Sequence, residues 1–238
     1  MTSSTDSFTT TDVRTASWDV AAGATARGTL VLLTGRGEHP GAYARFGKRI
    51  AFDGYRVHVV DTADQDAAAT LASALLASSD SAKPRVLAGS DTGAALALSL
   101  ASGAAEADAV VLAALPLGGA ASALADDEVR SACPLHRQVL AQEENLDAGA
   151  LAAGLAPAAV PRAEDIPVPV LAFHGEEDAV VPVGAARTWA AGLPHGTLVT
   201  TAGGLRDAFN DKQHRSVAAR IVLFLEELGT GPTVLVEN

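Results

Sequence analysis

An aspartate stands at the centre of a glycine-bracketed turn in residues 85–95, which read Arg-Val-Leu-Ala-Gly-Ser-Asp-Thr-Gly-Ala-Ala. Gly89 and Gly93 flank Asp91 at the spacing of a nucleophile elbow, where a strand turns sharply into a helix and presents the central side chain. Ser90 lies one place too early, because its own flanking positions are not glycines. A carboxylate here can attack a carbon, accept a proton, or cap the helix that follows.

Three further segments carry side chains that could complete an active site. Residues 32–43 read Leu-Leu-Thr-Gly-Arg-Gly-Glu-His-Pro-Gly-Ala-Tyr, residues 170–182 read Val-Leu-Ala-Phe-His-Gly-Glu-Glu-Asp-Ala-Val-Val-Pro, and residues 203–211 read Gly-Gly-Leu-Arg-Asp-Ala-Phe-Asn-Asp. With the elbow, they resemble the monoglyceride-lipase and lysophospholipase branch of the α/β-hydrolases, in that family's order and over nearly the whole chain. The resemblance implies an α/β-hydrolase fold.

The resemblance also assigns a role to each segment, but two positions carry unexpected residues. It implies Asp91, Asp178 and Arg206 at the positions of the family's nucleophile, acid and histidine. The backbone N–H groups of Arg36 and Thr92 would form the oxyanion hole. The family has a serine and a histidine where this chain has Asp91 and Arg206. A guanidinium is permanently charged and cannot abstract a proton, so ordinary serine-esterase chemistry is not expected.

Three kinds of function remain open for such a site. Aspartate at the elbow is similar to the epoxide hydrolases and haloalkane dehalogenases, where it attacks a saturated carbon and a histidine then activates water. Asp91 could instead be a general base, with Arg206 stabilising an enolate, in a lyase, isomerase or cyclase. In the third alternative, Arg206 bridges Asp91 and Asp178 as a structural ion pair in an inactive binding protein. We favour an enzyme that acts on a small organic substrate, by non-hydrolytic chemistry or a specialised hydrolysis.

Three other side chains are candidates for the pocket. His39 lies in the expected oxyanion loop, and Ser90 adjoins the elbow. His136 lies in the segment that we expect to cover the pocket, close to the lone Cys133. The alternative for each is a packed or surface side chain without a chemical role.

The composition excludes several classes of function. The 238 residues carry a formal net charge of −11, so nucleic acid and anionic membranes, which need a basic face, are not expected partners. One cysteine and no cluster at zinc-ligand spacing predict no disulfide, no metal and no other cofactor. We find no secretory signal or membrane-spanning stretch, which predicts a cytoplasmic protein. A small-molecule substrate or ligand is the expected partner, and a homodimer through residues 233–236 is a candidate assembly.

Short β-branched runs alternate with alanine-rich runs, which predicts an α/β fold with a mostly parallel, doubly wound sheet. Strands are expected at Thr29–Leu33, Arg56–Val60, Arg85–Ala88, Ala109–Ala113, Val168–Phe173 and Thr197–Thr200, with an edge strand near Ser17–Ala21. Most are apolar at nearly every position, as strands buried on both faces are. Helices are expected at Ala42–Phe52, Ala67–Ala77, Gly93–Ala101, Val183–Ala191 and Ala208–Leu228.

We expect a single domain, residues 1–238, with an insertion at about residues 118–166. The insertion is far longer than an ordinary connection between a strand and the next, so we expect a short helical cap over a pocket at the carboxyl end of the sheet. Short helices are expected within it around His136–Gln142 and Asp147–Leu155. The alternative is an ordinary crossover with extra surface helix.

Overall fold

The computed structural model describes residues 13–103, 105–118, 125–152 and 160–231 of the chain. Its centre is a seven-stranded sheet in the order β1-β3-β2-β4-β5-β6-β7. The strands are β1 Thr15–Trp18, β2 Thr29–Leu33, β3 Arg56–Val60, β4 Arg85–Ser90, β5 Ala109–Ala113, β6 Val170–Gly175 and β7 Gly196–Thr201. β1 runs antiparallel to β3 at the edge, and all other pairs are parallel. The predicted fold class, a mostly parallel α/β sheet, is confirmed.

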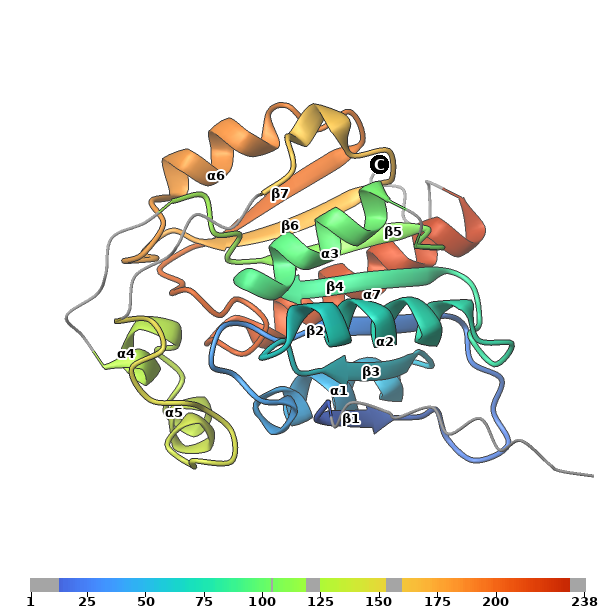
Figure 1. Ribbon diagram of the computed structural model, residues 1–238, viewed down its shortest axis with the longest axis horizontal. Helices are drawn as coiled ribbons and strands as arrows, with labels where there is room; N and C mark the ends of the chain where they lie inside the picture. The colour runs from blue at the N-terminus through green and yellow to red at the C-terminus, as the bar shows by residue number, and fades with distance from the viewer. Residues whose placement is uncertain (1–12, 104, 119–124, 153–159, 232–238) are drawn as a thin grey trace, which may run out of the picture.

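Helices pack on both faces of this sheet (Figure 1). They are α1 Ala44–Phe52, α2 Gln65–Ala77, α3 Thr92–Ser102, α4 Asp126–Arg130, α5 Pro134–Leu140, α6 Val183–Ala190 and α7 His214–Thr230, with short 3-10 helices at Pro40–Tyr43 and Ala163–Asp165. α1 and α7 share one core cluster with the sheet, and α2 and α3 share another on the opposite face. β2, β5 and β6 are buried at every position because helices cover both of their faces. None of the described helices is long and apolar enough to cross a membrane.

The structure corrects the sequence prediction at three places. α7 begins at His214 rather than Ala208, because residues 207–211 close into turns held by the carbonyl and carboxylate oxygens of Asp207. The edge strand spans Thr15–Trp18, which is nearer the N-terminus than the expected Ser17–Ala21. Residues 147–152 form turns rather than the expected helix, and the rest of that predicted helix lies outside the described residues.

α4 and α5 lie beyond the carboxyl ends of the strands, where Figure 1 shows them apart from the two helical layers. α4 and the residues after α5 contact the loops that follow the strands: the backbone N–H of Arg206 donates to the carbonyl of Val129 in α4, and Glu38 forms an isolated β-bridge with Leu146. This placement puts the insertion beside the candidate site. That residues 118–166 act as a cap stays a prediction, and residues 119–124 and 153–159 lie outside the described part. Residues 233–236, the candidate dimer contact, also lie outside the described residues.

Candidate functional site

A strained turn presents Asp91 between β4 and α3. Asp91 has φ 48° and ψ −120°, backbone angles that cost free energy for a residue with a side chain. The turn is tight because the backbone at Gly89 passes close to the backbone at Gly93. A Cβ added at Gly89 would lie 2.3 Å from the carbonyl oxygen of Gly93. One added at Gly93 would lie 2.3 Å from the carbonyl oxygen of Leu33. The elbow predicted from the glycine spacing therefore has its structural reason in these close approaches.

Arg206 bridges the two carboxylates of the predicted triad. Its Nη2 lies 3.0 Å from Oδ1 of Asp91, and its Nη1 lies 2.8 Å from Oδ2 of Asp178. Nη2 also donates to the carbonyl of Ala114 at 3.2 Å. The side chains of Arg206 and Asp91 are each 1% exposed and that of Asp178 is 0% exposed, so water does not screen these charges. The structure thus brings the three predicted catalytic residues together as a buried ion cluster.

A second guanidinium holds the same carboxylate. Nη2 of Arg36 lies 2.9 Å from Oδ2 and 3.2 Å from Oδ1 of Asp91, and its Nε lies 3.3 Å from Oδ2. Both oxygens of Asp91 are therefore engaged, one of them by two arginines. The sequence resemblance assigns only the backbone N–H of Arg36 to the site, as part of the oxyanion hole. Its side-chain role was missed because it depends on how the loop after β2 folds back over the elbow.

A further buried pair anchors that loop to α4. Nη1 of Arg130 lies 2.6 Å from Oε1 of Glu38, and both side chains are 1% exposed. The hydroxyl of Tyr43 donates to Glu38, and Nη2 of Arg130 donates to the carbonyl of Arg36 at 2.5 Å. Burial raises the pKa of Glu38, and the charge of Arg130 opposes that rise. Burial also raises the pKa of Tyr43, and the neighbouring Glu38 adds to it, so this hydroxyl keeps its proton. None of these partners was predicted, and Arg130 in particular lies 92 residues from Glu38 in the sequence.

Both residues of the predicted oxyanion hole line one cavity. Its volume is about 420 Å³, and it is lined by Arg36, Gly37, His39, Asp61, Thr62, Ala63, Gln65, Thr92 and Asp147. His39 is 2% exposed and lies between two carboxylates, with Nδ1 3.0 Å from Asp61 and Nε2 3.1 Å from Asp147. Seven of the nine lining residues carry polar or charged side chains. The structure places His39 at this cavity, as the sequence suggested, but with both ring nitrogens already engaged.

The other two candidate pocket residues lie elsewhere. Ser90 is the last residue of β4, pairs in register with Ala113 and is 2% exposed. Nε2 of His136 lies 2.9 Å from Oδ2 of Asp207, and both side chains are 2% exposed. Burial acts to raise the pKa of Asp207, but contact with His136 and hydrogen bonds from Asn210 outweigh it and lower that pKa. His136 thus ties α5 to the loop before α7.

Comparison with known proteins supplies the fold. No protein-family model and no curated protein matches the sequence. Among solved structures, a monoacylglycerol lipase from Paleococcus ferrophilus superposes with a TM-score of 0.73 at 17% identity, over 92% of this chain and 100% of that one. A monoglyceride lipase from Saccharomyces cerevisiae reaches 0.70 at 14% identity, over 90% and 91%. MenH from S. aureus reaches 0.65 at 20% identity, over 90% and 98%.

The chain has the α/β-hydrolase fold. The fold implied by the sequence resemblance is therefore confirmed, and the elbow, the turn after β6 and the loop before α7 converge at the buried ion cluster. At these identities the likeness concerns the fold alone. The function of the site must therefore be inferred from its own side chains, which are two carboxylates and two guanidinium groups.

Proposed function

We propose that this chain is a hydrolase-fold ligand-binding protein without triad catalysis, in which Asp91, Arg206 and Asp178 serve the structure. The observation that carries this proposal is the placement of Arg206: one guanidinium contacts both carboxylates of the triad at 2.8 and 3.0 Å, out of contact with water. Arg36 completes the arrangement by occupying both oxygens of Asp91. Of the three alternatives drawn from the sequence, this is the one that the geometry supports best.

Hydrolysis would require a base, and neither of the two side chains described as pairing with Asp91 can serve as one. A covalent ester or acyl intermediate has to be resolved by water that a base activates, and neither Arg206 nor Arg36 can accept a proton. Before Asp91 could attack a carbon, it would have to leave hydrogen bonds to two guanidiniums in a buried site. Charge-assisted hydrogen bonds of this kind are the strong ones, and leaving a buried charge unpaired costs about 3–5 kcal/mol.

The 420 Å³ cavity beside the cluster is the binding site in this proposal. It lies at the carboxyl ends of the strands, where open α/β sheets bind their ligands. Asp61 and Asp147 offer acceptors, and Thr62, Thr92 and Gln65 offer donors and acceptors. The side chain of Asp147 is 66% exposed and so can be reached from solvent. We infer a small polar ligand that carries several hydroxyl or amino groups.

The retained elbow favours a second candidate, an enzyme with Asp91 as general base. Strained backbone angles at a residue with a side chain often persist because function uses them, and Asp91 keeps such angles. The cavity wall also includes Arg36 and Thr92, which the hydrolase resemblance assigns to the oxyanion hole. A lyase or isomerase of this kind would need the guanidinium of Arg36 or Arg206 to move away from Asp91 when substrate binds.

An assay with an activated ester, 4-nitrophenyl acetate, tests the proposal. We expect the wild-type protein to release 4-nitrophenol no faster than a variant in which Asp91 is replaced, Asp91→Asn. Turnover by the wild type that disappears in Asp91→Asn would overturn the proposal in favour of hydrolysis. In parallel, a thermal-shift screen of polyols, amino sugars and hydroxy acids should find stabilising ligands. Chemical conversion of any such hit by the wild type, absent in Asp91→Asn, would support the general-base candidate instead.

A further inference from the structure

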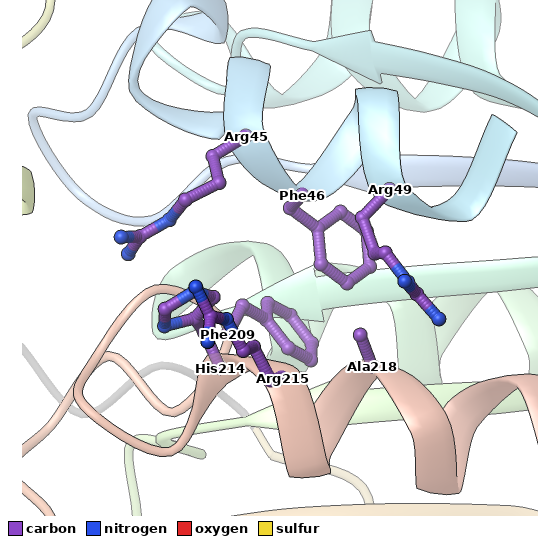
Figure 2. A pocket seen from close by; sticks show the side chains of 7 residues that line it. All are labelled: Arg45, Phe46, Arg49, Phe209, His214, Arg215 and Ala218. Atoms are coloured by element: carbon purple, nitrogen blue, oxygen red, sulfur yellow. The ribbon is translucent and has the colours of Figure 1, made fainter. Parts of the chain in front are cut away.

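A cavity between α1 and α7 carries charge of the sign opposite to that of the whole chain. It has a volume of about 360 Å³ and is lined by Arg45, Phe46, Arg49, Phe209, His214, Arg215 and Ala218 (Figure 2). Three arginines and a histidine thus gather at one place on a protein whose net charge is −11. The cavity shares no lining residue with the one beside Asp91.

Two of these arginines lack compensating charge. Nη1 of Arg45 lies 3.4 Å from Sγ of Cys133, and its Nη2 donates to the carbonyl of Asn210, so neither partner is a carboxylate. Nε of Arg45 is buried without a hydrogen-bond acceptor. Within the described part of the chain, no carboxylate pairs with Arg45 or Arg215, whereas Arg49 pairs with Asp53 at 3.1 Å. A buried donor without an acceptor is costly, so an anion in the cavity would relieve it.

The neighbouring histidine responds to this positive charge. Burial lowers the pKa of His214, and the charges of Arg45 and Arg215 lower it further, against a hydrogen bond from its Nδ1 to the carbonyl of Asp211. His214 is also the first residue of α7, and the N-cap residue Gln213 makes no side-chain capping bond. The start of a 17-residue helix adds positive potential at the same end of the cavity.

The floor of the cavity is apolar. The rings of Phe46 and Phe209 lie with their centroids 5.0 Å apart, and Figure 2 shows them between the two helices, with Ala218 beside them. Figure 2 shows the side chains of Arg45 and Arg49 extending to opposite sides of the Phe46 ring. A ligand that fits must therefore combine an anionic head with an apolar body. The volume lies within the range of small-molecule sites, about 300–1,000 Å³.

We propose that this cavity binds a small organic anion, with a carboxylate or phosphate head held by arginines of its wall and an apolar body packed on Phe46 and Phe209. Guanidinium groups suit such heads because their paired N–H donors match the geometry of two oxygens. The site is separate from the cluster at Asp91, so this proposal stands whether or not the proposed function does.

Isothermal titration calorimetry of the full chain with three probes tests the inference. Phenyl phosphate offers both head and body, inorganic phosphate offers the head alone, and benzyl alcohol offers a body without charge. We expect phenyl phosphate to bind at least about tenfold more tightly than either of the other two. Failure of phenyl phosphate to bind at millimolar concentration, or binding no tighter than that of inorganic phosphate, would overturn the proposal.

A pair of double variants locates the binding. Arg49→Gln with Arg215→Gln removes two exposed charges of the cavity wall, and Lys48→Gln with Lys212→Gln removes two exposed charges close by but outside it. The net charge changes equally in both. We expect phenyl phosphate to bind about tenfold or more weakly to the first variant and to be nearly unaffected in the second. Equal affinity in the two variants would contradict a site built from these arginines.

Discussion

A guanidinium and an imidazole can both bridge Asp91 and Asp178, but only the imidazole can carry a proton between them. Arg206 makes the bridge with two donors, at 3.0 Å to one carboxylate and 2.8 Å to the other. With Arg36, the four side chains comprise two negative and two positive charges, so the cluster is balanced. The three positions that form the catalytic triad in the family resembled therefore join three loops at the carboxyl edge of the sheet: those after β4, β6 and β7.

Loss of Arg206 should be costly for this reason. Arg206→Met leaves two buried carboxylates short of their shared partner, and we expect unfolding to become easier by about 3–5 kcal/mol. Arg206→Lys keeps the charge but not the two-pronged geometry, so we expect an intermediate loss. Urea denaturation followed by circular dichroism measures both.

The matched control is Arg162→Met. Arg162 pairs with Glu164 at the surface, where its side chain is 74% exposed, and exposed pairs contribute about 0–1 kcal/mol. A loss as small for Arg206→Met as for this control would mean that the buried bridge is not structural.

The turn from β4 into α3 was predicted from the spacing of two glycines, and the structure shows why the spacing is strict. Gly93→Ala would place a Cβ 2.3 Å from the carbonyl oxygen of Leu33. We expect it to destabilise the protein by about 3 kcal/mol, since backbone atoms in packed strands cannot move aside. Thermal unfolding tests this against Gly184→Ala in α6, where a Cβ meets nothing within 4 Å. The second change should be neutral or stabilising by about 0.5–1 kcal/mol, and equal losses would contradict the packing argument.

α5 is attached to the loop before α7 through His136 and Asp207, a contact that no local sequence pattern could indicate. His136→Ala should destabilise the fold by about 3 kcal/mol, because Asp207 stays buried without its contact to the ring of His136. The lowered pKa of Asp207 sets the pH dependence. Its contribution is present above the unfolded value of 3.8 and is lost as the pH falls through the lower folded value.

The difference in unfolding free energy between wild type and His136→Ala should therefore shrink on acidification below pH 3.8. Urea titrations across this range at constant ionic strength measure it. A difference that stays constant or grows as Asp207 becomes protonated would argue against the contact as its source.

At the scale of the whole molecule, the features predicted from the sequence are those that depend on a local residue pattern. Buried strands, alanine-rich helices and the elbow all have short-range signals, and the parallel sheet followed from their alternation. The start of α7 was missed because side-chain hydrogen bonds of Asp207 replace helical ones there. Two ion pairs, Arg36–Asp91 and Glu38–Arg130, were not predicted. Each joins segments that are distant in the sequence and that only the fold brings together.

We propose that Asp91 and Arg206 act as a unit that stabilises the native structure. A double-mutant cycle measures this coupling from the unfolding free energies of the wild type, Asp91→Asn, Arg206→Met and the double variant, each obtained by urea denaturation. We predict an interaction energy of at least about 1.5 kcal/mol, with the double variant less destabilised than the sum of the single changes. Additive losses would contradict the claim and return Asp91 to the list of available catalytic groups.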